Sequence, residues 1–181
     1  AEELYIDNCN PEHLSLVIDL LKNSGVSIDI VDDKTIKITN SQNVENKSYR
    51  AFNVTTKEYP GFATDLQSPL VTFLTQCEGE SAVTETIFEG RFKYVNDLID
   101  LGARISVIDN NKSNVSGPTP LHQSPNNHLT AHDIRAGFAI VLACLIAKGN
   151  FTVSNIHLID RGYESLETRL RALGADIRRE K

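Results

Sequence analysis

One short pattern occurs three times along this chain: apolar residues at helical spacing, followed by a glycine. The three glycines, Gly25, Gly102 and Gly174, are 77 and 72 residues apart. A glycine directly after an apolar helical stripe is a common end of an α-helix, because glycine adopts the left-handed backbone conformation at little steric cost. Since a repeat of this length corresponds to one supersecondary unit, the chain is expected to consist of similar units that share a core.

The segments after the first two glycines alternate between apolar and polar residues. The alternation covers residues 26–30 and 105–107 and predicts strands with one buried face. Asn10 and Pro11 stand where the first of these helices should begin, as an N-cap and the first helical residue. The first two repeats therefore contain a helix that ends at a glycine and then a strand, and the first of these helices also has a recognisable start.

A second kind of helix also recurs. Residues 70–77 form an apolar stripe that ends near Gly79, and residues 133–149 form another that is apolar on nearly every side. A helix without a polar face is expected to be buried on all sides. Strands are predicted after these two helices, at residues 83–87 and 151–156.

These patterns predict an α/β fold of repeated units, each about 70 residues long by the spacing of the glycines. Two units are nearly whole, while the first lacks its buried helix, so the first unit is incomplete. At 181 residues and 40% hydrophobic, residues 1–181 suit a single domain. Because the first repeat begins in its second half, we expect this sequence to be part of a longer chain.

The charge and apolar patterns exclude several classes of partner. The net charge is −6, so general binding to nucleic acid or to an anionic membrane is not expected, and a bound anion must meet a local group of arginines. The longest apolar run, residues 138–147, is too short to span a bilayer, and the first residues lack a signal-peptide pattern. We therefore expect a soluble, cytoplasmic protein.

The three cysteines, Cys9, Cys77 and Cys144, are far apart and have no metal-ligand spacing. We expect them to be reduced thiols, and we expect neither a metal ion nor a cofactor.

Two aspartates stand at equivalent points before the two apolar helices. Asp65 and Asp133 are 68 residues apart. One interpretation is helix capping, which is worth about 1 kcal/mol. The other is a general base or an orienting carboxylate at the rim of a site.

Two arginines, Arg91 and Arg161, are 70 residues apart at the predicted starts of the second and third glycine-terminated helices. A cation there opposes the helix dipole, so a bound phosphate or carboxylate would explain it better than stability does. Pairing with the neighbouring Glu89 or Asp160 is the alternative. With Arg135, these groups would suit a phosphorylated carboxylic acid and a hydroxyl that must lose its proton.

Four ordered segments carry a resemblance to a known family. They are Tyr-Pro-Gly-Phe-Ala-Thr-Asp-Leu-Gln at residues 59–67, Thr-Glu-Thr-Ile-Phe-Glu-Gly-Arg-Phe at 84–92, Asp-Ile-Arg-Ala at 133–136 and Ile-Asp-Arg-Gly-Tyr-Glu at 159–164. Together they resemble the C-terminal half of the UDP-N-acetylglucosamine 1-carboxyvinyltransferases, which are enolpyruvyl transferases. The likeness runs through essentially the whole chain.

The resemblance implies a fold and an activity. The fold is one domain of an inside-out α/β barrel with pseudo-threefold symmetry, helices inside and sheets outside. The activity is transfer of the enolpyruvyl group of phosphoenolpyruvate to the 3′-hydroxyl of UDP-N-acetylglucosamine. It is the first committed step of peptidoglycan synthesis and so bears on cell-wall growth, cell shape, cell division and the cell cycle.

The resemblance also assigns roles to residues. Asp65 would contact the sugar hydroxyl and act as its base, and Asp133 would lie near the reacting carbons. The implied catalytic residues are Asp65, Asp133 and Arg161, and the implied substrate-binding residues are Asp65, Ile87, Arg91, Arg135 and Arg161.

The departures from the family pattern limit what this chain should do alone. The family's loop cysteine and its N-terminal Lys-Asn pair belong to segments that this sequence lacks. The site would form between two domains, so the partner is a missing N-terminal domain and the chain alone should be inactive. Two alternatives stay open: a non-catalytic binding or regulatory module, and a shikimate-pathway enolpyruvyl transferase. The arginine in residues 159–163 argues against the latter, for which we expect a lysine-centred motif.

Overall fold

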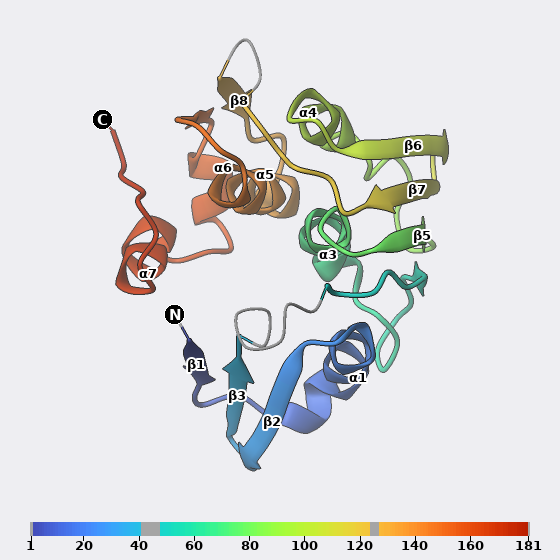
Figure 1. The fold of residues 1–181 in the computed structure, drawn as a ribbon, viewed down its shortest axis with the longest axis vertical. Helices are drawn as coiled ribbons and strands as arrows, with labels where there is room; N and C mark the ends of the chain where they lie inside the picture. The colour runs from blue at the N-terminus through green and yellow to red at the C-terminus, as the bar shows by residue number, and fades with distance from the viewer. Residues whose placement is uncertain (1, 41–47, 124–126, 181) are drawn as a thin grey trace.

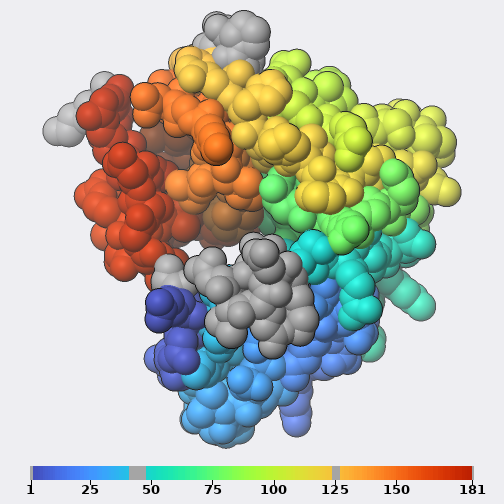
Figure 2. Space-filling model, in the orientation of Figure 1, coloured from blue at the N-terminus to red at the C-terminus, as the bar shows by residue number. Residues whose placement is uncertain are grey.

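A computed structural model of the chain describes residues 2–40, 48–123 and 127–180. The strands of these residues form three sheets, which lie toward the outside of the molecule, while two helices cross its centre (Figure 1). In the space-filling view, the N-terminal, middle and C-terminal thirds of the chain occupy separate sectors (Figure 2). This arrangement of α/β units with sheets outside and helices inside confirms the predicted fold class.

The first sheet is antiparallel and has the strand order β1–β3–β2. Its strands are β1 (Glu3–Ile6), β2 (Ser27–Asp32) and β3 (Thr35–Thr39), and the 3-10 helix η1 (Pro11–Leu14) and helix α1 (Ser15–Ser24) connect the first two. Ile18 of α1 packs against Ile28 and Ile36 of the sheet, and these three form a small core of their own. As predicted, Asn10 caps this segment: its side chain accepts a hydrogen bond from the amide of Glu12.

The second sheet has four strands in the order β4–β5–β7–β6, of which only the β4–β5 pair is parallel. The elements of this unit are β4 (Val54–Thr55), the 3-10 helix η2 (Thr64–Leu66), α3 (Gln67–Leu74), β5 (Gly79–Thr84), α4 (Val95–Asp100), β6 (Arg104–Asp109) and β7 (Lys112–Gly117). The third unit has a parallel pair of strands, β8 (His128–Thr130) and β9 (Thr152–Ser154). Its helices are α5 (Ile134–Ile146), α6 (His157–Asp160) and α7 (Leu166–Ala172).

The three predicted glycine-terminated helices all end in the same way. The residues Gly25, Gly102 and Gly174 have φ values of 110°, 97° and 98°. After each glycine, the next amide donates to the carbonyl five residues earlier: Val26 to Leu21, Ala103 to Leu98 and Ala175 to Leu170, at 2.9 to 3.0 Å. This is the Schellman ending, which satisfies carbonyls that the helix itself leaves free. The repeat seen in the sequence is therefore a repeat of structure.

Helices α3 and α5 are the two apolar helices of the sequence, and they pack against each other at the centre of the main core. The hydroxyl of Thr72 in α3 donates to the carbonyl of Ala139 in α5 at 3.1 Å. The prediction that the second helix is buried on all sides is wrong at its end, since Leu145 and Ile146 are 39% and 43% exposed. The first helix is also shorter than predicted, because α3 ends at Leu74 and turns lead to Gly79.

Helix α6 docks on α5 at a close approach over Gly137. A Cβ on Gly137 would lie 2.6 Å from Cγ1 of Ile159 and 2.9 Å from Cβ of Ala131, and both of these residues are buried. Because α6 carries the chain to Arg161, this contact sets the position of the turn that follows.

Substitution of Gly137 by alanine is expected to destabilise the fold. Alanine gains about 1 kcal/mol of helix propensity, but overpacking against Ile159 costs about 1–3 kcal/mol, so we expect a net loss of about 1 kcal/mol. Urea unfolding of the wild type and the variant measures this difference. A more stable variant would show that Ile159 moves aside at no cost.

Candidate active site

Asp65 lies in the 3-10 turn η2 that leads into α3, and its side chain is 55% exposed. Its Oδ1 atom lies 2.8 Å from Nε of Arg135 and 3.4 Å from Nη1 of Arg91. The Asp65 side chain accepts no hydrogen bond from the backbone of η2 or α3. The capping interpretation is therefore wrong for Asp65, which instead forms the centre of an ion-pair cluster with two arginines.

The two arginines reach Asp65 from different units. Arg135 is in the first turn of α5, and Arg91 lies in the turns before α4, which begins only at Val95. The expectation that Arg91 begins a helix is thus wrong, and so is its pairing with Glu89. The Arg91 guanidinium lies over the ring of Phe88, with Cζ 4.3 Å from the ring centroid. That contact holds the guanidinium beside Asp65 by a cation–π interaction.

The arginines change the acid–base character of Asp65. The hydrogen bond from Arg135 lowers the pKa of the Asp65 carboxyl, and Arg91 adds to this effect, whereas burial opposes it. The same hydrogen bond raises the pKa of Arg135. At neutral pH the cluster is therefore one carboxylate shared by two cations, with net positive charge to offer to an anion.

The lowered pKa of Asp65 predicts a pH dependence of stability. A carboxyl whose pKa is lower in the folded state stabilises the fold above its unfolded pKa, near 4, and this contribution disappears as the pH falls through the folded pKa. We expect the melting temperatures of the wild type and the Asp65→Asn variant to converge as the pH is lowered from 7 to about 3. Because the group is largely exposed, the difference at neutral pH should be small. A difference that is constant over this range would contradict the assignment.

Asp133 is the N-cap of α5. Its Oδ1 accepts hydrogen bonds from the amides of Arg135 at 2.8 Å and of Ala136 at 2.9 Å. The capping interpretation therefore holds here, and the cap also fixes the backbone from which the Arg135 side chain projects. The catalytic role that the family resemblance implies for Asp133 stays a prediction.

Arg161 is not where the sequence predicted it. It is the C-cap residue of α6, not the first residue of α7, and its side chain makes no ion pair with any described residue. Asp160 pairs with Arg179 instead, at 2.6 Å. A cation at the C-terminal end of a helix is favourable, so the dipole argument for a bound anion does not apply. Helix α6 nevertheless brings this turn to the start of α5, where a Cβ on Gly162 would lie 2.7 Å from Ile134.

Ile87 is half-buried in the segment that leaves β5, and it is placed there by a neighbour that the sequence interpretation did not single out. Strand β5 ends at Thr84, earlier than predicted, because the side chain of Glu85 accepts hydrogen bonds from the amides of Ile87 and Phe88. These amides consequently do not continue the sheet. Glu85 is 1% exposed, a degree of burial that no pattern in the sequence indicates for a glutamate.

Aromatic side chains form a second group of missed residues. Tyr163 stacks on Phe138 of α5 with ring centroids 4.2 Å apart, and burial raises the pKa of Tyr163, while Arg135 partly opposes the rise. The tyrosine thus lies within electrostatic reach of the cluster, and it belongs to the same Ile-Asp-Arg-Gly-Tyr segment as Arg161.

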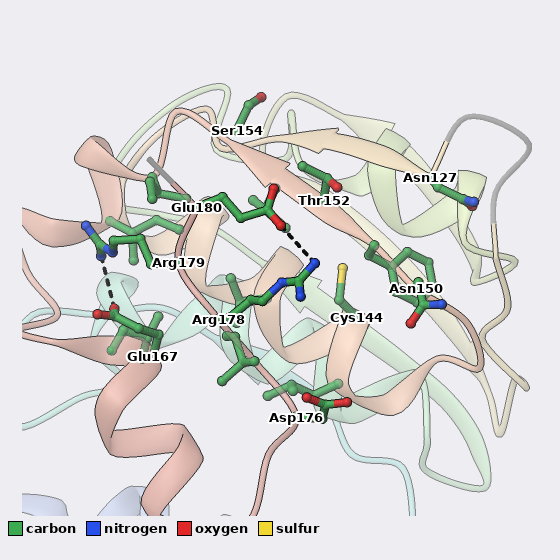
Figure 3. Close-up of a pocket in the computed structure, with 18 of the residues that line it drawn as sticks. Asn127, Cys144, Asn150, Thr152, Ser154, Glu167, Asp176, Arg178, Arg179 and Glu180 are labelled. Atoms are coloured by element: carbon green, nitrogen blue, oxygen red, sulfur yellow. Dashed lines mark hydrogen bonds and ion pairs between the residues drawn. The ribbon is translucent and has the colours of Figure 1, made fainter.

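A cavity of about 890 Å³ lies away from this cluster, between β9, the end of α5 and residues 176–180 (Figure 3). Its lining includes Cys144 and Arg178 but neither Asp65 nor either of its two arginines. Burial raises the pKa of Cys144 to about 12 and that of Cys77 to about 11, so neither is a ready nucleophile at neutral pH. All three cysteines are free thiols. The described residues contain no cluster of His, Cys, Asp and Glu that could hold a metal ion.

The family model of EPSP synthase (3-phosphoshikimate 1-carboxyvinyltransferase) matches residues 1–170. This chain belongs to that family. Within the EPSP synthase family, it is 43% identical over 177 residues to the UDP-N-acetylglucosamine 1-carboxyvinyltransferase of Helicobacter pylori strain 26695 and 38% identical to that of Koribacter versatilis. Both alignments cover 98% of this chain but only 40% and 39% of the relatives, so the chain spans about two fifths of their length.

Solved structures of the family agree with this assignment. The enolpyruvyl transferase NikO from Streptomyces tendae is 32% identical with a TM-score of 0.86, over 98% of this chain and 40% of NikO. EPSP synthase from Acinetobacter baumannii has a TM-score of 0.71 at 17% identity, over the same shares, which is a likeness of fold alone. The resemblance inferred from four short segments is confirmed. Among the described residues, no helix is both long and apolar enough to cross a membrane.

Proposed function

We propose that this chain is part of an enzyme that transfers the enolpyruvyl group of phosphoenolpyruvate to the 3′-hydroxyl of UDP-N-acetylglucosamine. The observation that carries the proposal is the convergence of Asp65, Arg91 and Arg135, which come from separate segments of the chain. The names and identities of the bacterial relatives support the choice of substrates. Peptidoglycan synthesis is the corresponding proposed process. The free thiols of the three cysteines support the cytoplasm as the location of the enzyme.

The cluster suits this chemistry because one set of cations can serve two purposes. The phosphate and carboxylate of phosphoenolpyruvate would be bound by Arg91 and Arg135, and by Arg161 from the neighbouring turn. As those arginines turn to the substrate, Asp65 loses the partners that lower its pKa. Its pKa then moves back up, which makes it a better base for the sugar hydroxyl. The hydroxyl oxygen bonds to C2 of phosphoenolpyruvate while Asp65 takes the hydroxyl proton and the methylene carbon gains a proton from an acid outside this chain. The resulting methyl group then loses a proton, which restores the double bond as the C2–O bond to phosphate breaks and phosphate leaves.

The activity needs more than this chain provides. The cluster is on an exposed surface, with Asp65 half open to solvent, and charges act far more strongly when a second wall excludes water. We propose that the remaining three fifths of the relatives' length supply that wall as an N-terminal domain.

Phosphate release tests the proposal directly. The full-length protein that contains this chain should release phosphate from phosphoenolpyruvate only when UDP-N-acetylglucosamine is present, and residues 1–181 alone should not. Release with shikimate 3-phosphate in place of the nucleotide sugar would favour a shikimate-pathway enolpyruvyl transferase, the enzyme after which the matching family model is named. No release with either acceptor would favour a non-catalytic module.

A further inference from the structure

Glu85 is a buried carboxylate with an unusually complete set of hydrogen-bond donors. Its Oε1 accepts from the Thr56 hydroxyl at 2.8 Å and from the amides of Ile87 at 2.9 Å and Phe88 at 3.2 Å. Its Oε2 accepts from the Thr64 hydroxyl at 2.8 Å. Burying a carboxylate costs several kcal/mol unless such bonds replace its water. Ending a strand at this point does not require a buried carboxylate with four hydrogen-bond donors.

Three of the four donors to Glu85 belong to two parts of the candidate site. Thr64 directly precedes Asp65 in η2, whereas Ile87 and Phe88 begin the segment that leads to Arg91. A single carboxylate therefore connects the turn that carries the proposed base to the loop that carries a proposed anion-binding arginine. Oε2 accepts from the turn that carries Asp65, and Oε1 accepts from the loop that carries Arg91.

A second layer keeps the carboxylate in place. The Thr56 hydroxyl, which donates to Oε1, accepts in turn from the amide of Thr86 at 2.8 Å, and the Thr86 hydroxyl donates to the Thr56 carbonyl. The amide of Glu85 itself donates to the carbonyl of Asn111 at 2.7 Å. A fully satisfied buried network of this kind is rigid, and it defines one geometry for the segments attached to it.

We propose that Glu85 is a positioning residue that sets the distance between Asp65 and the Ile87–Arg91 loop, and through it the geometry of enolpyruvyl transfer. In this role Glu85 acts through the two segments that it holds and not by contact with a substrate. This proposal rests on the proposed function. It is consistent with the long contact of 3.4 Å between Arg91 and Asp65, which leaves the arginine free to turn to a ligand while the backbones of both residues stay fixed. Misplacing reacting groups by about 1 Å costs about 10²-fold in rate.

Two variants of Glu85 in the full-length protein test the proposal by their kinetics. Glu85→Ala leaves both amides and both hydroxyls without their acceptor, so kcat/KM is expected to fall by about 10²-fold. Glu85→Gln keeps an Oε1 acceptor for the two amides, and its amide group can donate to Thr64, so we expect recovery to within about tenfold of the wild type. The matched control is Glu80→Gln in β5, the strand that directly precedes Glu85. Glu80 is exposed, accepts among the described residues only from the Ser116 hydroxyl, and its substitution should change kcat/KM by less than about threefold.

Thr64→Val covers the case in which Glu85→Ala does not fold. It keeps the side-chain volume and removes only the bond to Oε2, so kcat/KM should fall by about tenfold at a melting temperature within a few degrees of the wild type. Unchanged kcat/KM in Thr64→Val, or in a folded Glu85→Ala, overturns the proposal. A lower melting temperature without a kinetic change in either variant also overturns it, because that is the behaviour of a purely structural residue.

Hydrogen exchange separates this proposal from the proposed function. In Glu85→Gln the amides of Ile87 and Phe88 should remain protected, and in Thr64→Val the exchange should accelerate near residue 65. If the wild type transfers no enolpyruvyl group, the proposed function fails, and exchange alone decides the role of Glu85. Faster exchange at residues 64–66 in Thr64→Val then supports positioning, and unchanged exchange overturns it.

Discussion

Replacing Asp65 by asparagine in the full-length protein is expected to lower turnover by about 10²- to 10⁴-fold, the range that a positioned general base contributes. Asparagine keeps an oxygen that can accept from Arg135, but it cannot take a proton from a hydroxyl. The melting temperature at neutral pH should change little, because the side chain is 55% exposed and caps no helix. Phosphate release at saturating substrate measures the first effect and calorimetry the second.

The matched control for this substitution is Asp32→Asn, at the end of β2. Asp32 is likewise an exposed aspartate; it accepts a hydrogen bond from the amide of Lys34 at 2.8 Å, and it is far along the chain from the cluster. Its substitution should leave turnover unchanged. If Asp65→Asn instead lowers the melting temperature and spares turnover, then the Asp65 cluster is a structural ion pair and the proposed base must be sought elsewhere.

The fold was largely predictable because short local sequence signals mark the helices and strands of its repeats. A glycine at the C′ position, an asparagine before a proline and an alternating strand each act within a few residues, so Gly25, Asn10 and the strand of Ile28 could be placed without knowing the rest. The end of α5 was not predictable in this way. The exposure of Leu145 and Ile146 depends on what lies beside them, and a periodic pattern cannot report that.

Three of the five charged residues that the sequence singles out form the Asp65 cluster, but their contacts were not predictable. Asp65, Arg91 and Arg135 do converge, although Arg91 lies before a helix and not in its first turn. The error at Arg161 has a definite cause: the apolar spacing after it suggested one continuous helix, but Ser165 takes a left-handed conformation with φ of 48° and starts α7 afresh. Glu85 was missed because its partners come from three segments that meet only in the fold.

Substitution of Arg91 by alanine should weaken binding of phosphoenolpyruvate by about 10²-fold, because removing one charge-assisted partner of an anion costs about 2–5 kcal/mol. The fold should survive the change. Asp65 keeps its shorter bond to Arg135 at 2.8 Å, and Arg91 is held mainly by its contact with Phe88. Titration of the full-length protein with phosphoenolpyruvate in the presence of the nucleotide sugar measures the affinity.

Two further variants decide what the loss at Arg91 means. Arg91→Lys keeps the charge but not the planar fork, so it should restore only part of the affinity. Arg104→Ala removes an exposed arginine on β6 and should have no effect on the affinity for either substrate. If Arg91→Ala instead weakens binding of the nucleotide sugar as much as binding of phosphoenolpyruvate, the loop has moved, and the Arg91 guanidinium does not itself bind the anion. A selective loss for phosphoenolpyruvate, with Arg91→Lys intermediate, is the result that a direct bidentate contact requires.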